Sequence, residues 1–166
     1  MDKTITEESI LEALKQIPDP EIPVISIVDL GIIRRINILP QDKGVEIDIT
    51  PTYSGCPAMK QMEDDIVSTL KQKGVENIQI KMVYSPAWTT DWLSDDAKER
   101  LRKYGIAPPQ ESTGDKSFIT GKTKQIKCPR CGSLHTQMVS QFGSTACKAL
   151  YKCTDCLEPF DYFKCI

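Results

Sequence analysis

The spacing of apolar residues predicts two amphipathic helices in the first half of the chain. The first begins after Thr6, whose hydroxyl suits an N-cap, and ends at Pro18. The second runs from Pro57 to about Lys73 and is followed by Gly74, a residue type common just beyond a helix end. The apolar faces consist of Ile10, Leu11, Leu14 and Ile17 in the first helix, and of Met59, Met62, Ile66, Val67 and Leu70 in the second.

Between and after these helices the chain has the patterns of β-strands. Residues 32–39 and 45–49 flank a turn at 40–44, and the second of these runs alternates apolar and polar side chains, which predicts a hairpin with one buried face. Residues 75–84 have the pattern of a further strand, and residues 94–105 that of a short helix. The order α-β-β-α-β with an appended helix favours a small two-layer α+β sandwich over a parallel doubly wound fold.

Charge and cysteine content divide the chain into two modules. Residues 1–114 carry 13 basic and 19 acidic groups, a net charge of −6, whereas residues 115–166 carry 8 basic and 4 acidic groups, a net charge of +4. Six of the seven cysteines lie in the last 39 residues. The polar, aperiodic stretch that begins at Pro108 is typical of a linker. We therefore expect an α+β domain at residues 1–107, a linker at 108–125 and a cysteine-rich module at 126–166.

The composition of the whole chain narrows the class of protein. With 166 residues, of which 40% are hydrophobic, the chain has enough apolar material for a packed core. A net charge of −2 speaks against a general nucleic-acid binder. No run approaches the roughly 18 apolar residues of a membrane helix, and the N-terminus is too polar for a signal peptide. We expect a cytoplasmic protein, in which structural disulfides are uncommon and metal ligation is the leading explanation for the cysteines.

Two C-x-x-C turns, Cys128 with Cys131 and Cys153 with Cys156, carry the strongest local signal for chemistry. Each turn supplies two thiolates, and two such turns complete a tetrahedral shell around one ion. The spacing therefore predicts a C-terminal four-cysteine zinc ribbon with structural zinc, because four protein ligands leave no position open for a substrate. Iron in a rubredoxin-like site and unligated, reduced cysteines remain as alternatives.

The other notable residues of this module have simpler interpretations. We expect Cys147 and Cys165 to be small apolar thiols of the core, with an extension of the metal cluster as the alternative. His135 is the only histidine of the chain, and we expect it to be a surface or hydrogen-bonding residue. The aromatic segment 158–163 is typical of the packing of a small core, with docking to a partner as the alternative.

The second candidate site is the loop from Thr50 to Pro57, between a predicted strand and a predicted helix. Pro57 suits the first helical position, so Cys56 would lie next to free backbone N–H groups, where the helix dipole favours a thiolate. We expect the pKa of Cys56 to lie below that of a free thiol, with a buried, inert cysteine as the alternative. Gly55 permits a close approach of the backbone to an anion or a partner. The domain has no histidine, so it offers no Cys-His pair for hydrolysis.

Several motifs of the first domain carry a family resemblance. These are DPEIP at residues 19–23, IVDLG at 27–31, TPT at 50–52 and CP at 56–57. Over about residues 5–105 they resemble the metal-sulfur-cluster assembly domain of bacterial SufT-like proteins and of a eukaryotic cytosolic iron–sulfur targeting factor. With the cysteine-rich stretch 143–165 added, the chain resembles the D-subunit family of the bacterial phenylacetyl-CoA epoxidase (ring 1,2-oxygenase) system.

The resemblance implies an accessory role in aerobic phenylacetate catabolism, where a di-iron oxygenase epoxidises the ring and an iron–sulfur flavin reductase supplies electrons. It implies that the chain helps to mature an iron or iron–sulfur centre of that system. The sequence itself has no di-iron carboxylate–histidine set, dinucleotide fingerprint or phosphate loop, so we expect no independent catalytic activity. By the same resemblance, Cys56 matches a reactive cysteine that binds iron or a cluster transiently, and Glu21 an acidic loop residue. The supporting loop positions are Asp19, Thr50, Thr52 and Gly55.

Three functions stay open at this point. The chain is a maturation factor, a non-catalytic scaffold that docks the reductase to the oxygenase, or a rubredoxin-like electron carrier that uses its C-terminal cysteines. The oxygenase and reductase components are the expected partners, and we expect neither nucleic acid nor a membrane. The sequence leaves homo-oligomerisation open.

Overall fold

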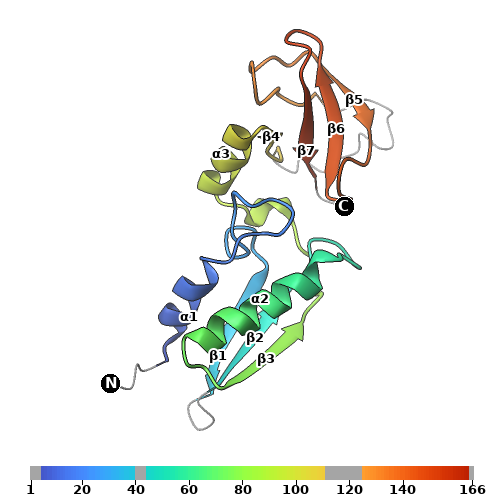
Figure 1. Cartoon of the computed structure of the whole chain (residues 1–166). Coiled ribbons are helices and arrows are strands. Elements are labelled where there is room, and N and C mark those ends of the chain that lie inside the picture. Colours follow the sequence, from blue (N-terminus) through green and yellow to red (C-terminus); the bar gives the residue numbers. More distant parts are fainter. Residues whose placement is uncertain (1–4, 40–43, 111–124, 165–166) are drawn as a thin grey trace. The chain divides into compact units, whose positions relative to one another are not determined.

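The chain folds as two compact units, Met1–Trp88 and Thr89–Ile166. The computed structural model describes residues 5–39, 44–110 and 125–164 (Figure 1). Each unit has its own sheet, with strand order β1-β2-β3 in the first and β4-β7-β6-β5 in the second. None of the helices in these described ranges combines the length and the apolar character that a membrane span requires.

The first unit confirms the predicted α-β-β-α-β order. Strands β1 and β2 pair antiparallel, and β2 pairs in parallel with β3, with α2 as the crossover. Helix α1 begins at Thr6, whose side chain accepts a hydrogen bond from the backbone N–H of Ser9 in a capping box. The elements are α1 (Glu7–Leu14), β1 (Ile33–Leu39), β2 (Gly44–Ile49), α2 (Ala58–Gln72) and β3 (Asn77–Met82).

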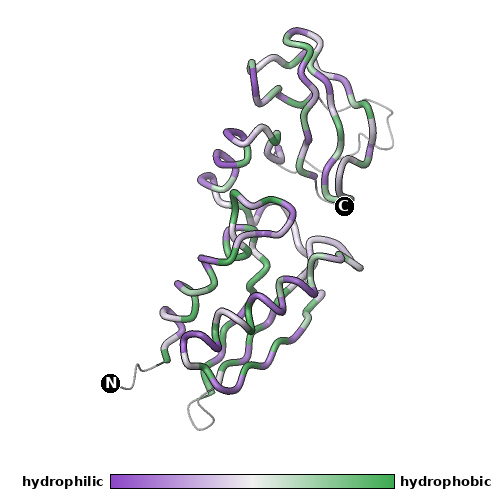
Figure 2. The backbone as a smooth tube through the Cα atoms, viewed as in Figure 1, coloured by the Kyte–Doolittle hydropathy of each residue, from purple (hydrophilic) through white to green (hydrophobic). Residues whose placement is uncertain are grey.

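The core of the first unit lies between one face of its sheet and the two helices. Alternate residues of a strand point to the same face, which is why Val45, Ile47 and Ile49 of β2 are all fully buried. Helix α1 contacts α2 and β1, and α2 contacts β3, which gives the two-layer arrangement (Figure 1). Hydrophilic and hydrophobic residues follow one another along α2 (Figure 2), as expected of a helix with one buried face.

The loop between α1 and β1 is held in shape by its own side chains. Asp19 is buried, and its Oδ1 accepts hydrogen bonds from the backbone N–H groups of Glu21 at 2.8 Å and Ile22 at 2.7 Å. Farther along the loop, the backbone oxygen of Leu30 accepts a hydrogen bond from the indole Nε1 of Trp88 at 2.8 Å. These bonds give the loop a defined conformation, as its prolines lead us to expect.

The second unit is built around an antiparallel meander. Strand β6 pairs antiparallel with both β5 and β7, and the short β4 pairs in parallel with β7. Gly105 ends α3 in the left-handed conformation, with φ of 99°. The elements are η2 (a 3₁₀ helix, Thr90–Trp92), α3 (Asp95–Tyr104), β4 (Ile106–Ala107), β5 (Thr136–Ser140), β6 (Lys148–Cys153) and β7 (Pro159–Phe163).

Aromatic residues form much of the core of this second unit. The ring of Tyr151 stacks on Phe160 with centroids 5.9 Å apart and meets Tyr162 edge-on at 5.8 Å. Cys128 and Cys153 belong to the same buried cluster. The aromatic segment therefore packs the ribbon core, which confirms the packing interpretation.

Residues 89–107 differ from the sequence expectation in the sheet that they join. The sequence pattern assigns these residues to the end of the first domain. In the structure, β4 pairs instead with β7, more than 50 residues later, and Ala107 lies in the core of the second unit. Pairing over such a distance leaves no mark on the local pattern. The limits 1–107, 108–125 and 126–166 stay a prediction, and residues 111–124 of the expected linker lie outside the described residues.

Gly44 of β2 lies close to Asn77, its partner in β3. A Cβ at this position would lie 2.7 Å from the backbone oxygen of Asn77 and 2.9 Å from the Asn77 Cβ. We therefore expect Gly44→Ala to lower the free energy of unfolding by about 1–3 kcal/mol, the usual cost of overpacking, as measured by urea denaturation. Ser68→Ala, at an exposed position of α2, is the control and should change stability by less than about 0.5 kcal/mol. A Gly44→Ala protein as stable as the wild type would contradict this close approach.

Candidate functional site

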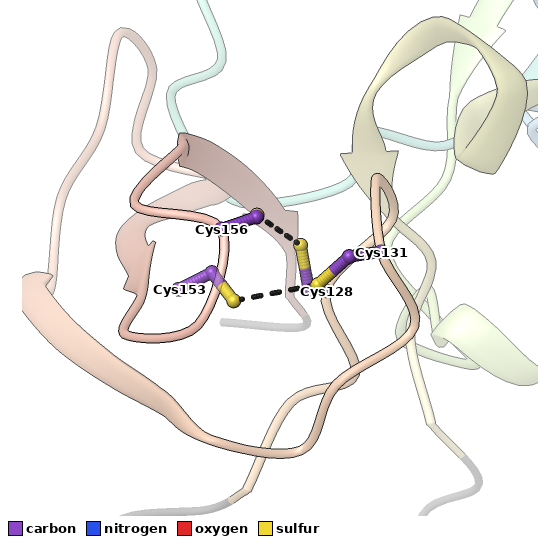
Figure 3. A group of neighbouring side chains, drawn as sticks. All are labelled: Cys128, Cys131, Cys153 and Cys156. Carbon is purple, nitrogen blue, oxygen red and sulfur yellow. Dashed lines mark hydrogen bonds between the residues drawn. The ribbon is translucent and has the colours of Figure 1, made fainter.

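Four cysteine sulfurs meet in the second unit (Figure 3). The Sγ atoms of Cys128 and Cys156 are 3.8 Å apart, those of Cys131 and Cys153 are 3.6 Å apart, and all four lie within 4.8 Å of one another. An ion with tetrahedral bonds of about 2.3 Å to sulfur needs sulfurs about 3.8 Å apart, so the cluster fits a thiolate-bound metal ion. No other three or more His, Cys, Asp or Glu side chains gather in this way within the described ranges.

Two tight turns place these sulfurs. In the first turn, the N–H of Gly132 donates to the backbone oxygen of Cys128 at 3.0 Å, and Gly132 has φ of 78°, a conformation that glycine adopts readily. In the second turn, Leu157 follows the last cysteine with φ of 65°, which is strained for a side chain of its kind. The second turn is closed by the N–H of Cys153, which donates to the backbone oxygen of Glu158 at 3.0 Å.

The four cysteines of the cluster differ in their exposure to solvent. Cys128 and Cys153 are buried, Cys156 is half-buried and Cys131 is exposed. The structure thus brings together the four cysteines that the sequence singles out and leaves one of these residues, Cys131, exposed to solvent.

The thiols of the cluster differ in their affinity for protons. Backbone N–H groups of Cys156 and Asp155 donate to the Cys153 sulfur and lower its pKa to about 7. The backbone N–H of Glu158 lowers the pKa of Cys156. Burial and the neighbouring thiols have a larger, opposite effect, so the pKa of Cys156 is raised to about 12. Additional thiolates are therefore disfavoured without a cation, and a divalent ion removes that penalty by attracting all four sulfurs.

Cys56 lies in the loop between β2 and α2, in the first unit. Its backbone N–H donates to the carbonyl oxygen of Tyr53 at 3.3 Å, and Gly55 turns the chain with φ of 81°. Pro57 occupies the N-cap position and α2 begins at Ala58, one residue later than the sequence predicts. The Cys56 side chain is half-buried.

The pKa of the Cys56 thiol is raised above its ordinary value, so the expectation of a lowered pKa is wrong. Burial is the largest cause. The backbone N–H of Ala58 and the hydroxyl of Tyr53 stabilise the thiolate, but the charges of Glu21 and Asp19 act against it and raise the pKa. The single N–H from the helix start does not offset burial and two carboxylates.

The loop residues named by the family resemblance are placed differently from one another. Glu21 is half-buried and Asp19 buried, and both act on Cys56 through their charge. Thr50 is buried at the end of β2 and Thr52 is half-buried. Within the part of the chain that the structure describes, neither threonine side chain has a hydrogen bond to the Cys56 sulfur. The structure thus associates the two carboxylates, rather than the threonines, with the thiol.

Tyr53 belongs to this site although the sequence does not mark it. Its hydroxyl forms a hydrogen bond that lowers the pKa of Cys56, against the raising effect of burial. Its carbonyl oxygen also accepts the Cys56 N–H. Its place three residues before the cysteine was the available signal, but a single aromatic residue in a loop is too common to indicate a role.

Two further residues of the second unit agree with their predicted roles. His135 is exposed, and its Nδ1 lies 3.1 Å from Oδ2 of Asp155, so it is a hydrogen-bonding surface residue. Cys147 is buried, with its Sγ 3.1 Å from Oγ1 of Thr145. Cys165 lies outside the described residues.

Two family models match separate parts of the chain. Residues 7–82 match the model described as an iron-sulfur cluster assembly protein. Residues 112–164 match the model described as the PaaD zinc beta ribbon domain. The first match covers the loop of Cys56, and the second covers the four-cysteine cluster.

Individual proteins are similar to the whole chain or to its first half. A protein of Escherichia coli (strain K12), named as a candidate D subunit of 1,2-phenylacetyl-CoA epoxidase, is 51% identical over 153 residues, which are 92% of this chain and 89% of that protein. An Fe-S protein maturation auxiliary factor of Porphyromonas gingivalis (strain ATCC BAA-308 / W83) is 34% identical over 58% of this chain and 90% of its own length. A crystal structure described as Domain of Unknown Function DUF59 from Bacillus anthracis has a TM-score of 0.53 and 28% identity, and the match covers 57% of this chain and 90% of that chain.

Loss of one sulfur from the four-cysteine cluster should abolish metal retention. We expect about one metal ion per chain in protein purified without oxygen, and almost none in Cys153→Ser, as measured by elemental analysis. The variant should also become sensitive to protease in residues 125–164, because a core this small gains much of its stability from the metal. Cys147→Ser, which changes a buried cysteine outside the cluster, is the matched control and should retain the ion. A wild-type chain with less than about half an equivalent of metal and a protease-resistant C-terminal unit would contradict this assignment.

The charge of Glu21 should slow the alkylation of Cys56. Removing this charge by Glu21→Gln lowers the pKa of the thiol, because the carboxylate raises it in the folded protein. The rate of alkylation then rises at a given pH, and the midpoint of the pH–rate profile moves to lower pH. Peptide mapping after a short pulse of iodoacetamide measures the rate at Cys56 alone. Glu76→Gln, at an exposed residue with no influence on the pKa of Cys56, is the control, and an equal profile for both variants would refute the electrostatic coupling.

Proposed function

Since the chain belongs to the family of the 1,2-phenylacetyl-CoA epoxidase D subunit, we propose that it is an accessory protein that helps to mature an iron or iron–sulfur centre of that system. The match of its first unit to an iron–sulfur assembly model supports this role. So does the similarity to a protein named as an Fe-S maturation auxiliary factor. The oxygenase and reductase components of the epoxidase are the partners that we propose.

The observation that carries the proposal is the charge around Cys56. Burial is the largest cause of the raised pKa of this thiol, and the charges of Glu21 and Asp19 raise it further because they repel the thiolate. The same charges attract a cation, and at equal distance they attract a divalent iron about twice as strongly as a proton. Iron therefore competes well for this sulfur, and the soft thiolate is a ligand that iron and iron–sulfur clusters prefer.

The few ligands around Cys56 also suit iron or a cluster that is bound only transiently. Cys56 does not belong to a group of three or more ligands within bonding reach of one ion, among the residues that the structure describes. A single thiolate with two nearby carboxylates leaves most coordination positions to water or to a recipient protein. We propose that iron or a cluster is bound here transiently, as the substrate of a transfer.

We propose that the four-cysteine cluster holds zinc and has a structural role. The sulfur–sulfur distances of 3.6 and 3.8 Å suit tetrahedral zinc. The family description of this module as a zinc ribbon supports the same ion. Four protein thiolates leave no open position, so the ion would stabilise the second unit without taking part in a reaction.

The role of Cys56 can be tested in cells that lack the chromosomal copy of this protein. We expect the Cys56→Ser variant to fold but to restore less than about a tenth of the wild-type rate of phenylacetate consumption, because an oxygen ligand binds iron–sulfur species poorly. The iron content of the purified reductase and oxygenase should fall in parallel. Ser54→Ala, at an exposed residue of the same loop, is the matched control and should restore the full rate.

Two results would replace this proposal with another function. Wild-type consumption with fully metallated partners in Cys56→Ser cells would favour a scaffold that docks the reductase to the oxygenase. A purified protein with the visible absorption of an iron tetrathiolate would favour a rubredoxin-like electron carrier. A colourless protein that contains zinc agrees with the structural role of the second unit.

A further inference from the structure

A group of polar side chains connects the two cysteine turns without involving their sulfurs. The hydroxyl of Ser133 donates to Oδ2 of Asp155, and the same hydroxyl accepts the backbone N–H of His135 at 2.9 Å. The imidazole Nδ1 of His135 lies 3.1 and 3.2 Å from the two carboxylate oxygens of Asp155. Because an ionised carboxylate only accepts hydrogen bonds, Nδ1 carries the proton and donates it.

Thr154 adds a second connection between the same two turns. Its backbone N–H donates to the carbonyl oxygen of His135 at 2.8 Å, and its hydroxyl donates to the same oxygen at 2.9 Å. We call the group of Ser133, His135, Thr154 and Asp155 the clasp. Its first two members follow Cys131 along the chain, and the other two lie between the cysteines of the second turn.

The main chain and the side chain of Asp155 form hydrogen bonds to different cysteine turns. Its backbone N–H donates to the Cys153 sulfur and helps to lower the pKa of that thiol. Its carboxylate holds Ser133 and His135 of the opposite turn. The negative charge of Asp155, which precedes Cys156 in the chain, would be repelled by thiolates at this site, and the bonds to Ser133 and His135 stabilise the carboxylate against that repulsion.

We propose that the clasp holds the two cysteine turns together and thereby limits the rate at which the four-cysteine site releases its metal. Cys131 is the exposed ligand of the cluster, so a competing chelator reaches this sulfur first. For the metal to leave, the first turn must move away from the second, and that movement breaks the hydrogen bonds to Asp155 and His135. The clasp residues are positioning residues for the metal site and do not bind the metal themselves.

The inference rests on metal binding at the four-cysteine site and is independent of any transfer at Cys56. The test uses the full chain loaded with one equivalent of zinc and mixed with excess EDTA, with the loss of zinc followed over time. We expect Asp155→Ala and His135→Ala to lose zinc about tenfold faster than the wild type, the lower end of the usual effect of residues that orient metal ligands. Thr154→Val, which removes one hydroxyl bond and keeps the side-chain shape, should give a smaller increase.

The control for Asp155→Ala is Asp95→Ala. Asp95 is an exposed acidic residue at the start of α3 in the same unit, it has no part in the cysteine turns or the clasp, and the substitution removes the same charge. It should leave the rate of zinc loss at the wild-type value. Circular dichroism of each zinc-loaded variant shows whether the fold is intact, and if Asp155→Ala does not fold, His135→Ala and Thr154→Val decide the outcome.

Three results would overturn the inference. Rates of zinc loss in His135→Ala and Thr154→Val equal to the wild-type rate would show that the clasp has no influence on release. An equal acceleration in Asp155→Ala and Asp95→Ala would assign the effect to the lost charge. A wild-type chain that takes up no zinc or other metal would refute the metal site itself, and that outcome is visible before any variant is compared.

Discussion

Repulsion among four sulfurs gathered within 4.8 Å is the constraint on which the second unit depends. Two of these residues, Cys128 and Cys153, also belong to the hydrophobic core, next to Tyr151 and Phe160. The metal and the aromatic core therefore stabilise the same few strands, and loss of one weakens the other. Because the buried core is small, metal binding and folding of this unit are expected to be coupled.

The cysteine of the first unit, Cys56, has a different relation to the core. Among the residues that the structure describes there, the hydrophobic core between the sheet and the two helices contains no cysteine. Cys56 lies at the end of that core, in a loop that also receives the charges of Glu21 and Asp19. A core next to a half-buried thiol suits the reversible binding that we propose for Cys56, because iron or a cluster can bind and leave without unfolding the domain.

In the function that we propose, the two units separate a structural metal site from a site of exchange. Four thiolates enclose one ion and leave no open position, whereas one thiolate with two carboxylates at a distance leaves most positions free. In the four-cysteine cluster, burial and the neighbouring thiols raise the pKa of Cys156. In the loop of the first unit, burial and the two carboxylates raise the pKa of Cys56. The number of ligands, rather than the acidity of the thiols, therefore distinguishes the four-cysteine site from the transient site that we propose at Cys56.

Local sequence patterns by themselves determined the elements of the first unit and the ligand set of the second. Helical spacing marked α1 and α2, alternation marked β2, and the two C-x-x-C pairs marked the cluster, because each of these signals spans only a few neighbouring residues. The tertiary structure alone decided the pairing of β4 with β7, the direction of the Cys56 pKa shift and the contact of His135 with Asp155. Each of these depends on groups 20 or more residues apart, and no local period encodes which distant charge or strand will lie beside a given side chain.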